Sequence, residues 1–156
     1  MGRIITEELV RKAVELTGPN AELVLAMKET VWGPTWVEGF IWAPGLGDAI
    51  FFTLGEKNDW QPKEEQASSH EVAKRKLAVL VREGVPTSTV VSTQPWCLQE
   101  GEFLYAGGAT RDGIFVALSG ARGRVDEALA EVVISFIRML AHMEVDRRVA
   151  NKEMKI

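Results

Sequence analysis

The residue best suited to bind a metal or a haem iron is His70, one of two histidines in the sequence. It falls in the first turn of a predicted helix, where the helix dipole disfavours the protonated imidazole and leaves a nitrogen free to coordinate. A single exposed histidine usually has no such role, so a purely solvated side chain is the alternative. His142, late in the last predicted helix, is expected to lie at an interface or in solvent.

The second candidate is the stretch GGATRDGIFVALSG, residues 107 to 120, which places several glycines around one apolar strand. Gly107 and Gly108 would let a ligand approach the backbone, or would only form a bulge. Ser119 and the following glycine precede the last predicted helix, whose free amides favour a carboxylate or a phosphate. A plain loop into a helix has the same pattern, and the spacing of a Walker loop is absent.

Five basic side chains could meet an anionic ligand. The candidates are Lys74, Arg75, Arg111, Arg122 and Arg124. The net charge of −4 does not exclude this role, because charges beyond about 8 Å are largely screened at physiological salt. Solvated faces are the usual alternative for such residues.

The sequence offers no clear nucleophile. Cys97 lies between Trp96 and Leu98, an apolar setting that would raise the thiol pKa and that predicts a buried thiol. No GxSxG motif is present, and no spacing supports a Ser/His/Asp triad. The residues therefore decide neither for nor against an enzyme.

Composition limits the class of protein. A chain of 156 residues, 46% of them hydrophobic, can build one core without disulfides or zinc, and its single cysteine is typical of a reducing compartment. The charged first residues and the lack of a run of about 18 apolar residues favour a cytoplasmic protein without a membrane span. The net charge of −4, with both signs interspersed, argues against nucleic-acid binding.

The first half of the chain predicts one helix and three strands. The helix covers 6–17, is capped by Thr6 and ends at Gly18-Pro19. Strands are predicted over 22–31, 36–43 and 49–54, the first two forming a hairpin. Trp36, Phe40 and Trp42 share one strand face. A polar surface loop, 55–66, follows.

The second half predicts two helices and two strands. Ser68 and Glu71 form a capping box that opens a helix running to Glu83 and closed by Gly84. Residues 85–100 are expected to be mostly loop with a short helical turn. Strands 102–108 and 114–120 join through the turn Asp112-Gly113, and apolar periodicity predicts the last helix over 125–140.

This order of elements lacks regular strand-helix alternation, so it predicts an α+β fold with a mainly antiparallel sheet of five strands and about three packing helices. We expect a single domain over 1–145 and a C-terminal tail over 146–156.

Several motifs resemble the GlcG/HbpS-like family of haem-binding or haem-degrading proteins, which includes the C-terminal domain of PduO. The motifs are Ala73 with 76–78 in the middle helix, Gly107-Gly108, Asp112-Gly113, Ser119-Gly120 and Asp126-Glu127, and the similarity covers roughly 36–140. The sequence departs from the family in its additional predicted strand at 22–31 and in the turn WAPGLGD.

The resemblance implies a profilin-like fold, a homo-oligomer and, in several members, haem or a corrinoid bound near the middle helix and the Gly-rich strand. It assigns no iron ligand here; His70 is proposed from its position. Degradation of haem would require bound iron, a reductant and oxygen.

Two functional hypotheses follow. The first is a self-associating small-molecule-binding protein with haem or a related tetrapyrrole as ligand, in which Gly107, Gly108 and Ser119 form the floor. His70 or Lys74 would then face the ligand, and Arg111 or Arg122 would meet its carboxylates. The second is a non-enzymatic assembly module whose aromatic hairpin and last helix form the contact. Binding predicts a pocket between the middle helix and the Gly-rich strand, whereas assembly predicts that side chains fill this space.

Overall fold

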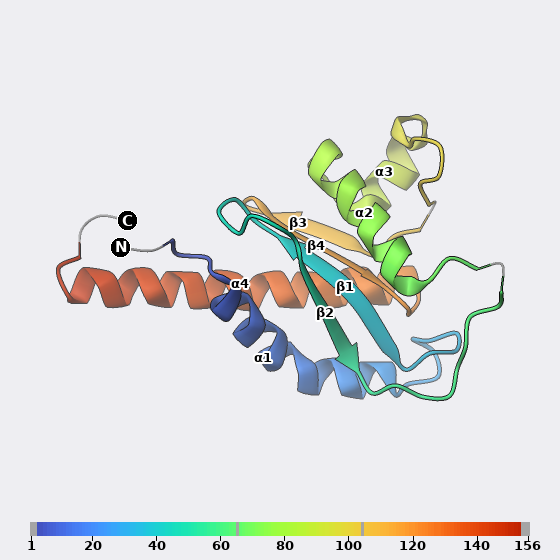
Figure 1. Ribbon diagram of the computed structural model, residues 1–156, viewed down its shortest axis with the longest axis horizontal. Coiled ribbons are helices and arrows are strands. Elements are labelled where there is room, and N and C mark those ends of the chain that lie inside the picture. Colours follow the sequence, from blue (N-terminus) through green and yellow to red (C-terminus); the bar gives the residue numbers. More distant parts are fainter. Residues whose placement is uncertain (1–2, 65, 104, 154–156) are drawn as a thin grey trace.

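A single antiparallel sheet forms the centre of the computed structural model, which describes residues 3–64, 66–103 and 105–153. Its strands are β1 (Trp36–Trp42), β2 (Ile50–Gly55), β3 (Gly108–Arg111) and β4 (Ile114–Ser119), in the order β2-β1-β4-β3. Helices α1 (Glu7–Leu25) and α4 (Gly123–Ala150) cover one face, and α2 (Ser69–Glu83) and α3 (Thr87–Thr93) lie on the other (Figure 1). The α+β class with an antiparallel sheet is confirmed.

The predicted strand at 22–31 is wrong, because its first residues continue α1 to Leu25. The helix runs through Pro19, although a proline inside a helix costs about 3 kcal/mol. The buried side chains explain this: Val10, Ala13, Thr17, Ala21 and Leu25 follow one another at three- and four-residue steps across the proline. Burial of Leu25 alone contributes about 2 kcal/mol, so packing against the sheet offsets much of the cost.

The strand predicted at 102–108 is also displaced, since β3 begins only at Gly108. Gly107 has a φ of +138°, outside the extended region of the strand, although its carbonyl still accepts a hydrogen bond from the Leu118 amide at 2.8 Å. Because the strand predicted at 22–31 is absent, the sheet of the described residues has four strands instead of five. The turn between β3 and β4 is confirmed, with positive φ at both Asp112 and Gly113.

The middle helix agrees closely with its prediction. The Ser68 hydroxyl accepts the Glu71 amide at 3.1 Å, and Gly84 ends α2 in the left-handed conformation. Residues 85–100 contain more helix than expected, namely α3 and a 3₁₀ turn at Pro95–Cys97. The described residues thus hold four α-helices, where about three were predicted.

The last helix is longer than predicted and extends beyond the sheet (Figure 1). Its first half buries Leu129, Val133 and Ile137 against the sheet. Residues 146–150, assigned to a tail from the sequence, continue the helix, and 154–156 lie outside the described residues. No helix in the described part of the chain has the length and hydropathy needed to cross a membrane.

Candidate functional site

The main candidate site is a pocket of about 800 Å³. It lies between the first half of α2, the residues Phe103, Tyr105 and Ala106, and the loop that leads from β4 into α4. The lining comprises Trp32, Trp60, Gln66, Ala67, Ser69, Val72, Lys76, Phe103, Tyr105, Ala106, Ser119, Gly120, Ala121, Arg122, Gly123, Arg124 and Asp126. Its volume falls within the range of about 300–1,000 Å³ that is usual for ligand sites.

A buried pair, Lys76 on α2 and Asp126 on α4, lies in this lining. The side chains are only 4% and 2% exposed, and Lys76 Nζ lies 3.8 Å from an Asp126 carboxylate oxygen. Lys76 also donates a hydrogen bond of 2.9 Å to the Leu118 carbonyl. One side chain therefore links α2 to β4 and to the start of α4.

Burial favours the neutral form of both partners. Desolvation raises the pKa of Asp126 to about 7, although Lys76 and the amides of Gly120 and Ala121 act in the opposite direction. Desolvation likewise lowers the pKa of Lys76, and Asp126 partly offsets this. Perturbed groups of this kind in a pocket are typical of functional sites, although structural ion pairs show them too.

The loop after β4 binds a carboxylate that belongs to the chain itself. One Asp126 carboxylate oxygen accepts a hydrogen bond of 3.1 Å from the Ala121 amide. From the sequence alone, the free amides of this region are expected to favour an external carboxylate or phosphate. Asp126 fills part of that site, so a ligand would meet only the remaining groups around Arg122 and Gly123.

The glycine pair at the start of β3, Gly107 and Gly108, is needed for the close approach of α2. A Cβ on Gly107 would lie 2.5 Å from Lys76 Nζ and 2.7 Å from the Leu118 carbonyl oxygen, and one on Gly108 would lie 2.5 Å from the Leu80 side chain. Side chains of α2 therefore fill the space directly over this pair. The pocket opens beside it, toward the start of α4.

Aromatic side chains from three segments line the pocket. Trp32 and Trp60 pack edge to face with ring centroids 4.8 Å apart, and Phe103 and Tyr105 stack at 5.9 Å. The loop that follows β2 thus contributes to the site through Trp60, which the Asn58 side chain helps to place by donating to the Gly33 carbonyl. Trp32 and Tyr105 are 50% and 58% exposed, so both offer ring surface to a ligand.

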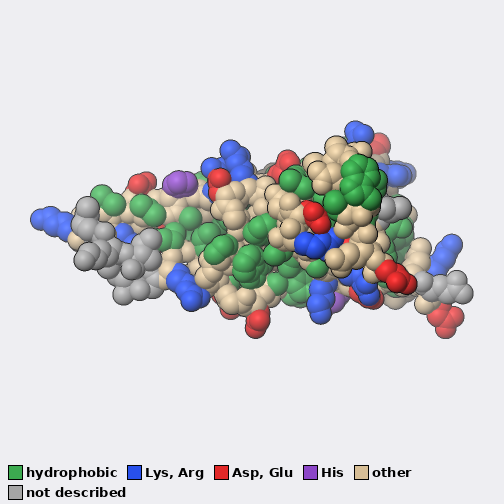
Figure 2. Space-filling model, turned by 90° about the horizontal axis from the view of Figure 1, so that it is seen from above, with side chains coloured by type: hydrophobic (Ala, Val, Ile, Leu, Met, Phe, Trp, Pro, Cys, Tyr) green, Lys and Arg blue, Asp and Glu red, His purple; other side chains and the backbone are tan. Residues whose placement is uncertain are grey.

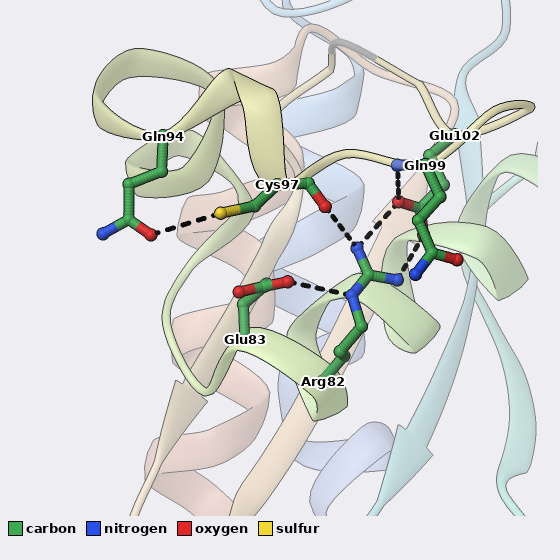
Figure 3. Close-up of polar contacts among 6 residues, drawn as sticks. All are labelled: Arg82, Glu83, Gln94, Cys97, Gln99 and Glu102. Atoms are coloured by element: carbon green, nitrogen blue, oxygen red, sulfur yellow. Dashed lines mark hydrogen bonds and ion pairs between the residues drawn. The ribbon is translucent and has the colours of Figure 1, made fainter.

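Arg82 anchors Glu102, the residue that precedes Phe103 (Figure 3). Its guanidinium binds both Glu102 carboxylate oxygens at 2.7 Å and donates to the Cys97 carbonyl at 3.1 Å. The hydrogen bonds from Arg82 hold the pKa of Glu102 below its usual value. Bidentate pairs of this kind fix geometry as well as charge, so Arg82 positions one aromatic wall.

Two cationic side chains at the pocket make no hydrogen bond or ion pair with the described part of the chain. They are Arg122 and Arg124, both exposed and at the amino-terminal end of α4. The one acid in the described lining is Asp126, which is already paired with Lys76. The positive end of the α4 dipole adds to the positive charge of the two arginines, so the mouth of the pocket favours an anion.

The residues proposed from the sequence fall in three places. Ser119 and Arg122 lie in the pocket. His70 and Lys74 lie elsewhere, lining a hollow of about 480 Å³ on the exposed side of α2, where the His70 ring packs 5.0 Å from Phe40. Arg111 is exposed on β3 and pairs with Ile114, the first residue of β4, whereas Ser119 is the last residue of that strand. The two ends of a strand of this length lie about 17 Å apart.

The pair that reaches deepest into the pocket was not singled out from the sequence. Both residues enter the comparison of motifs only as parts of the family pattern, Lys76 within 76–78 and Asp126 in Asp126-Glu127. Their spacing carried the signal: Lys76 follows the buried Ala73 by three residues, and Asp126 precedes the buried Leu129 by three. Cys97, expected to be buried, is partly exposed beside an exposed Trp96. The described residues contain no group of three metal-binding side chains.

Comparisons with known proteins leave the ligand open. No protein-family model matches the sequence, and no curated protein matches it. Among solved structures, the chain is similar to a crystal structure of a PduOC:haem complex, with 18% identity, a TM-score of 0.49 and coverage of 83% of this chain and 89% of that chain. A similarity of this size assigns no ligand, so the ligand has to be inferred from the pocket itself.

Proposed function

We propose that the protein binds a small aromatic anion in the pocket between α2 and the start of α4. The observation that carries the proposal is the pair of unpartnered arginines, Arg122 and Arg124, at the mouth of a cavity with aromatic walls. Each arginine would form charge-assisted hydrogen bonds with a carboxylate or phosphate, and the aromatic side chains would pack against the ring of the ligand.

Haem or a related tetrapyrrole is the ligand that the sequence suggests, and the pocket suits part of it. Arg122 and Arg124 would hold its carboxylates, and the aromatic residues would contact its ring. Bound haem would supply redox chemistry at its iron. Haem iron is held by His, Cys, Met or Tyr. Of these types the described lining contains Tyr105, whereas His70 lies in the hollow on α2.

An equilibrium titration tests the proposal. Haemin and 4-methylbenzoate would be added to the full chain while tryptophan fluorescence is followed, since Trp32 and Trp60 line the pocket. We expect saturable quenching, weakened roughly tenfold by Arg122→Ala and again by Arg124→Ala, because one charge-assisted hydrogen bond contributes about 1.5 kcal/mol. Higher salt should weaken binding in the wild type more than in the variants.

Lys12→Ala is the matched control, since it removes one exposed positive charge from α1, away from the pocket. Arg111→Ala tests the arginine predicted from the sequence. Binding that is unchanged by both pocket substitutions, or that Lys12→Ala weakens equally, would refute the pocket as the site.

The assembly hypothesis is favoured by a different observation, the projecting end of α4. Met139, Met143, Val145 and Val149 are 42%, 58%, 40% and 55% exposed. Hydrophobic side chains lie among charged ones along this narrow end of the molecule (Figure 2). We propose that α4 mediates self-association. Met143→Glu should lower the mass measured by light scattering, with Glu131→Gln as control, and an unchanged mass would refute this contact.

A further inference from the structure

The buried amine of Lys76 has surroundings that suit covalent chemistry. It lines the pocket, its Nζ donates to the Leu118 carbonyl at 2.9 Å, and an Asp126 carboxylate oxygen lies 3.8 Å away. The carbonyl fixes one N–H direction, and the carboxylate lies close enough to exchange a proton after a small movement. Exposed Lys74, on the same helix, has none of these neighbours.

We propose that Lys76 forms an imine with an aromatic aldehyde or ketone that carries a carboxylate or phosphate, and that Asp126 transfers the protons. This inference rests on the proposed function, because it concerns the same pocket and narrows the class of its ligand. Arg122 and Arg124 would hold the anionic group at the mouth, which leaves the carbonyl carbon of the ligand to reach the deeper amine.

The reaction needs no oxidant or reductant. Once the Lys76 ammonium has given a proton to the Asp126 carboxylate, the nitrogen lone pair forms a bond to the carbonyl carbon and the C=O π bond breaks. The Asp126 carboxyl group protonates the carbonyl oxygen, and the resulting carboxylate takes a proton from the nitrogen, which gives a carbinolamine. The carboxyl group then gives its proton to the hydroxyl, which leaves as water while the nitrogen lone pair forms the C=N bond, so a protonated imine remains beside the carboxylate. Desolvated lysines and neighbouring acids are the groups that perform these two steps in other proteins.

The electrostatics of the pair favour the reactive form. An ammonium group cannot attack a carbonyl, so the proton must first leave Lys76. Burial lowers the pKa of Lys76 and raises that of Asp126, so transfer of a proton from the ammonium to the carboxylate costs less here than in water. The products of that transfer are a neutral amine and a neutral acid, which are the partners that the reaction requires.

The test uses 4-formylbenzoate as the probe, with sodium cyanoborohydride to reduce any imine to a stable amine. The full chain is treated with limiting probe, digested and mapped by mass spectrometry. We expect Lys76 to be modified several-fold faster than Lys74, because burial lowers the pKa of Lys76 and so raises its fraction of neutral amine. 4-Methylbenzoate, which lacks the carbonyl, should protect Lys76 and leave Lys74 unprotected.

Two variants separate reaction from binding. Asp126→Asn should slow the modification of Lys76, and Lys76→Arg should abolish the adduct in that peptide, while both still quench with 4-methylbenzoate. Wild-type mapping decides the question if a variant fails to fold. Quenching by 4-methylbenzoate without preferential modification of Lys76 would overturn the imine and keep the pocket. Absence of quenching in the wild type would overturn both.

Discussion

Replacement of Asp126 by asparagine should change how stability depends on pH. In the folded protein burial raises the pKa of this carboxyl to about 7, against 3.8 for the ordinary group. Between these values the folded state keeps the proton and the unfolded state has lost it. The free energy of unfolding contributed by Asp126 therefore falls as pH rises through this window, and it is constant above about pH 7.

The size of the effect follows from the shift. Each pKa unit corresponds to about 1.4 kcal/mol, so Asp126 should lower stability by about 4 kcal/mol between pH 4 and pH 7. Lys76 contributes with the opposite sign, because its folded pKa is lowered: its contribution rises with pH in the window below 10.5. Asparagine keeps the shape and an acceptor for the Ala121 amide but does not titrate.

The assay is urea unfolding of the wild type and of Asp126→Asn at several pH values from 4 to 9. The difference between the two curves cancels the contributions of ionisable groups that do not interact with Asp126. It should change by about 4 kcal/mol, with the variant gaining relative to the wild type as pH rises. In Lys76→Met the stability should continue to fall with rising pH above pH 7, because the lysine charge that lowers the pKa of Asp126 is then missing. Glu131→Gln, an exposed acid on the same helix, controls for loss of one charge. Parallel curves for the wild type and Asp126→Asn would refute the reasoning.

Three further predictions concern the surroundings of the pocket. Gly107→Ala should lower the free energy of unfolding by about 3 kcal/mol, because the new Cβ would clash with Lys76 and the alanine would have to adopt a positive φ. Gly47→Ala, where φ is positive but the space is open, should cost about 1 kcal/mol in the same denaturation assay. An equal loss would contradict the steric account. Arg82→Ala should cost only about 1 kcal/mol globally, since the arginine is partly exposed, yet hydrogen exchange over 97–103 should rise at least about tenfold; unchanged exchange would show that other contacts hold the wall. If haemin occupies the pocket, Tyr105→Phe should shift its Soret band and His70→Ala should not, and the opposite pattern would place haem in the hollow on α2.

Sequence patterns predicted correctly the features that depend only on neighbouring residues. The serine cap at Ser68, the terminal Gly84 and the turn at Asp112-Gly113 each depend on a few neighbouring residues, and the structure contains all three. The Glu71 carboxylate, predicted as the other half of a capping box, pairs with Arg75. The apolar stripe of the last helix spans four turns, so its existence was clear although its ends were not. The profilin-like topology stays a prediction, because strand order depends on contacts distant in sequence.

The errors arose where tertiary packing outweighs local preference. Gly18-Pro19 is a strong helix stop, yet the helix continues because Ala21 and Leu25 are buried by the same face that buries Ala13. Similarly, the strand predicted at 102–108 has suitable residues, but Arg82 holds its first residue, Glu102, and Arg75 holds the preceding Gly101 through hydrogen bonds. Such anchors join residues about 20 or more positions apart, so patterns among neighbouring residues do not reveal them.

The same difference explains why the candidate site was found only in part. Sequence patterns drew attention to glycines as places where a ligand could approach the backbone, and Gly107 does allow a close approach, but by the Lys76 amine. The bare backbone therefore makes room for a charged side chain in the interior. Burial of a lysine and an aspartate is costly unless each satisfies the other, and apolar replacements at such positions are often neutral or stabilising. If Lys76→Met combined with Asp126→Leu leaves the fold as stable as the wild type but prevents modification by 4-formylbenzoate, the pair is required for the chemistry of the pocket and not for the fold.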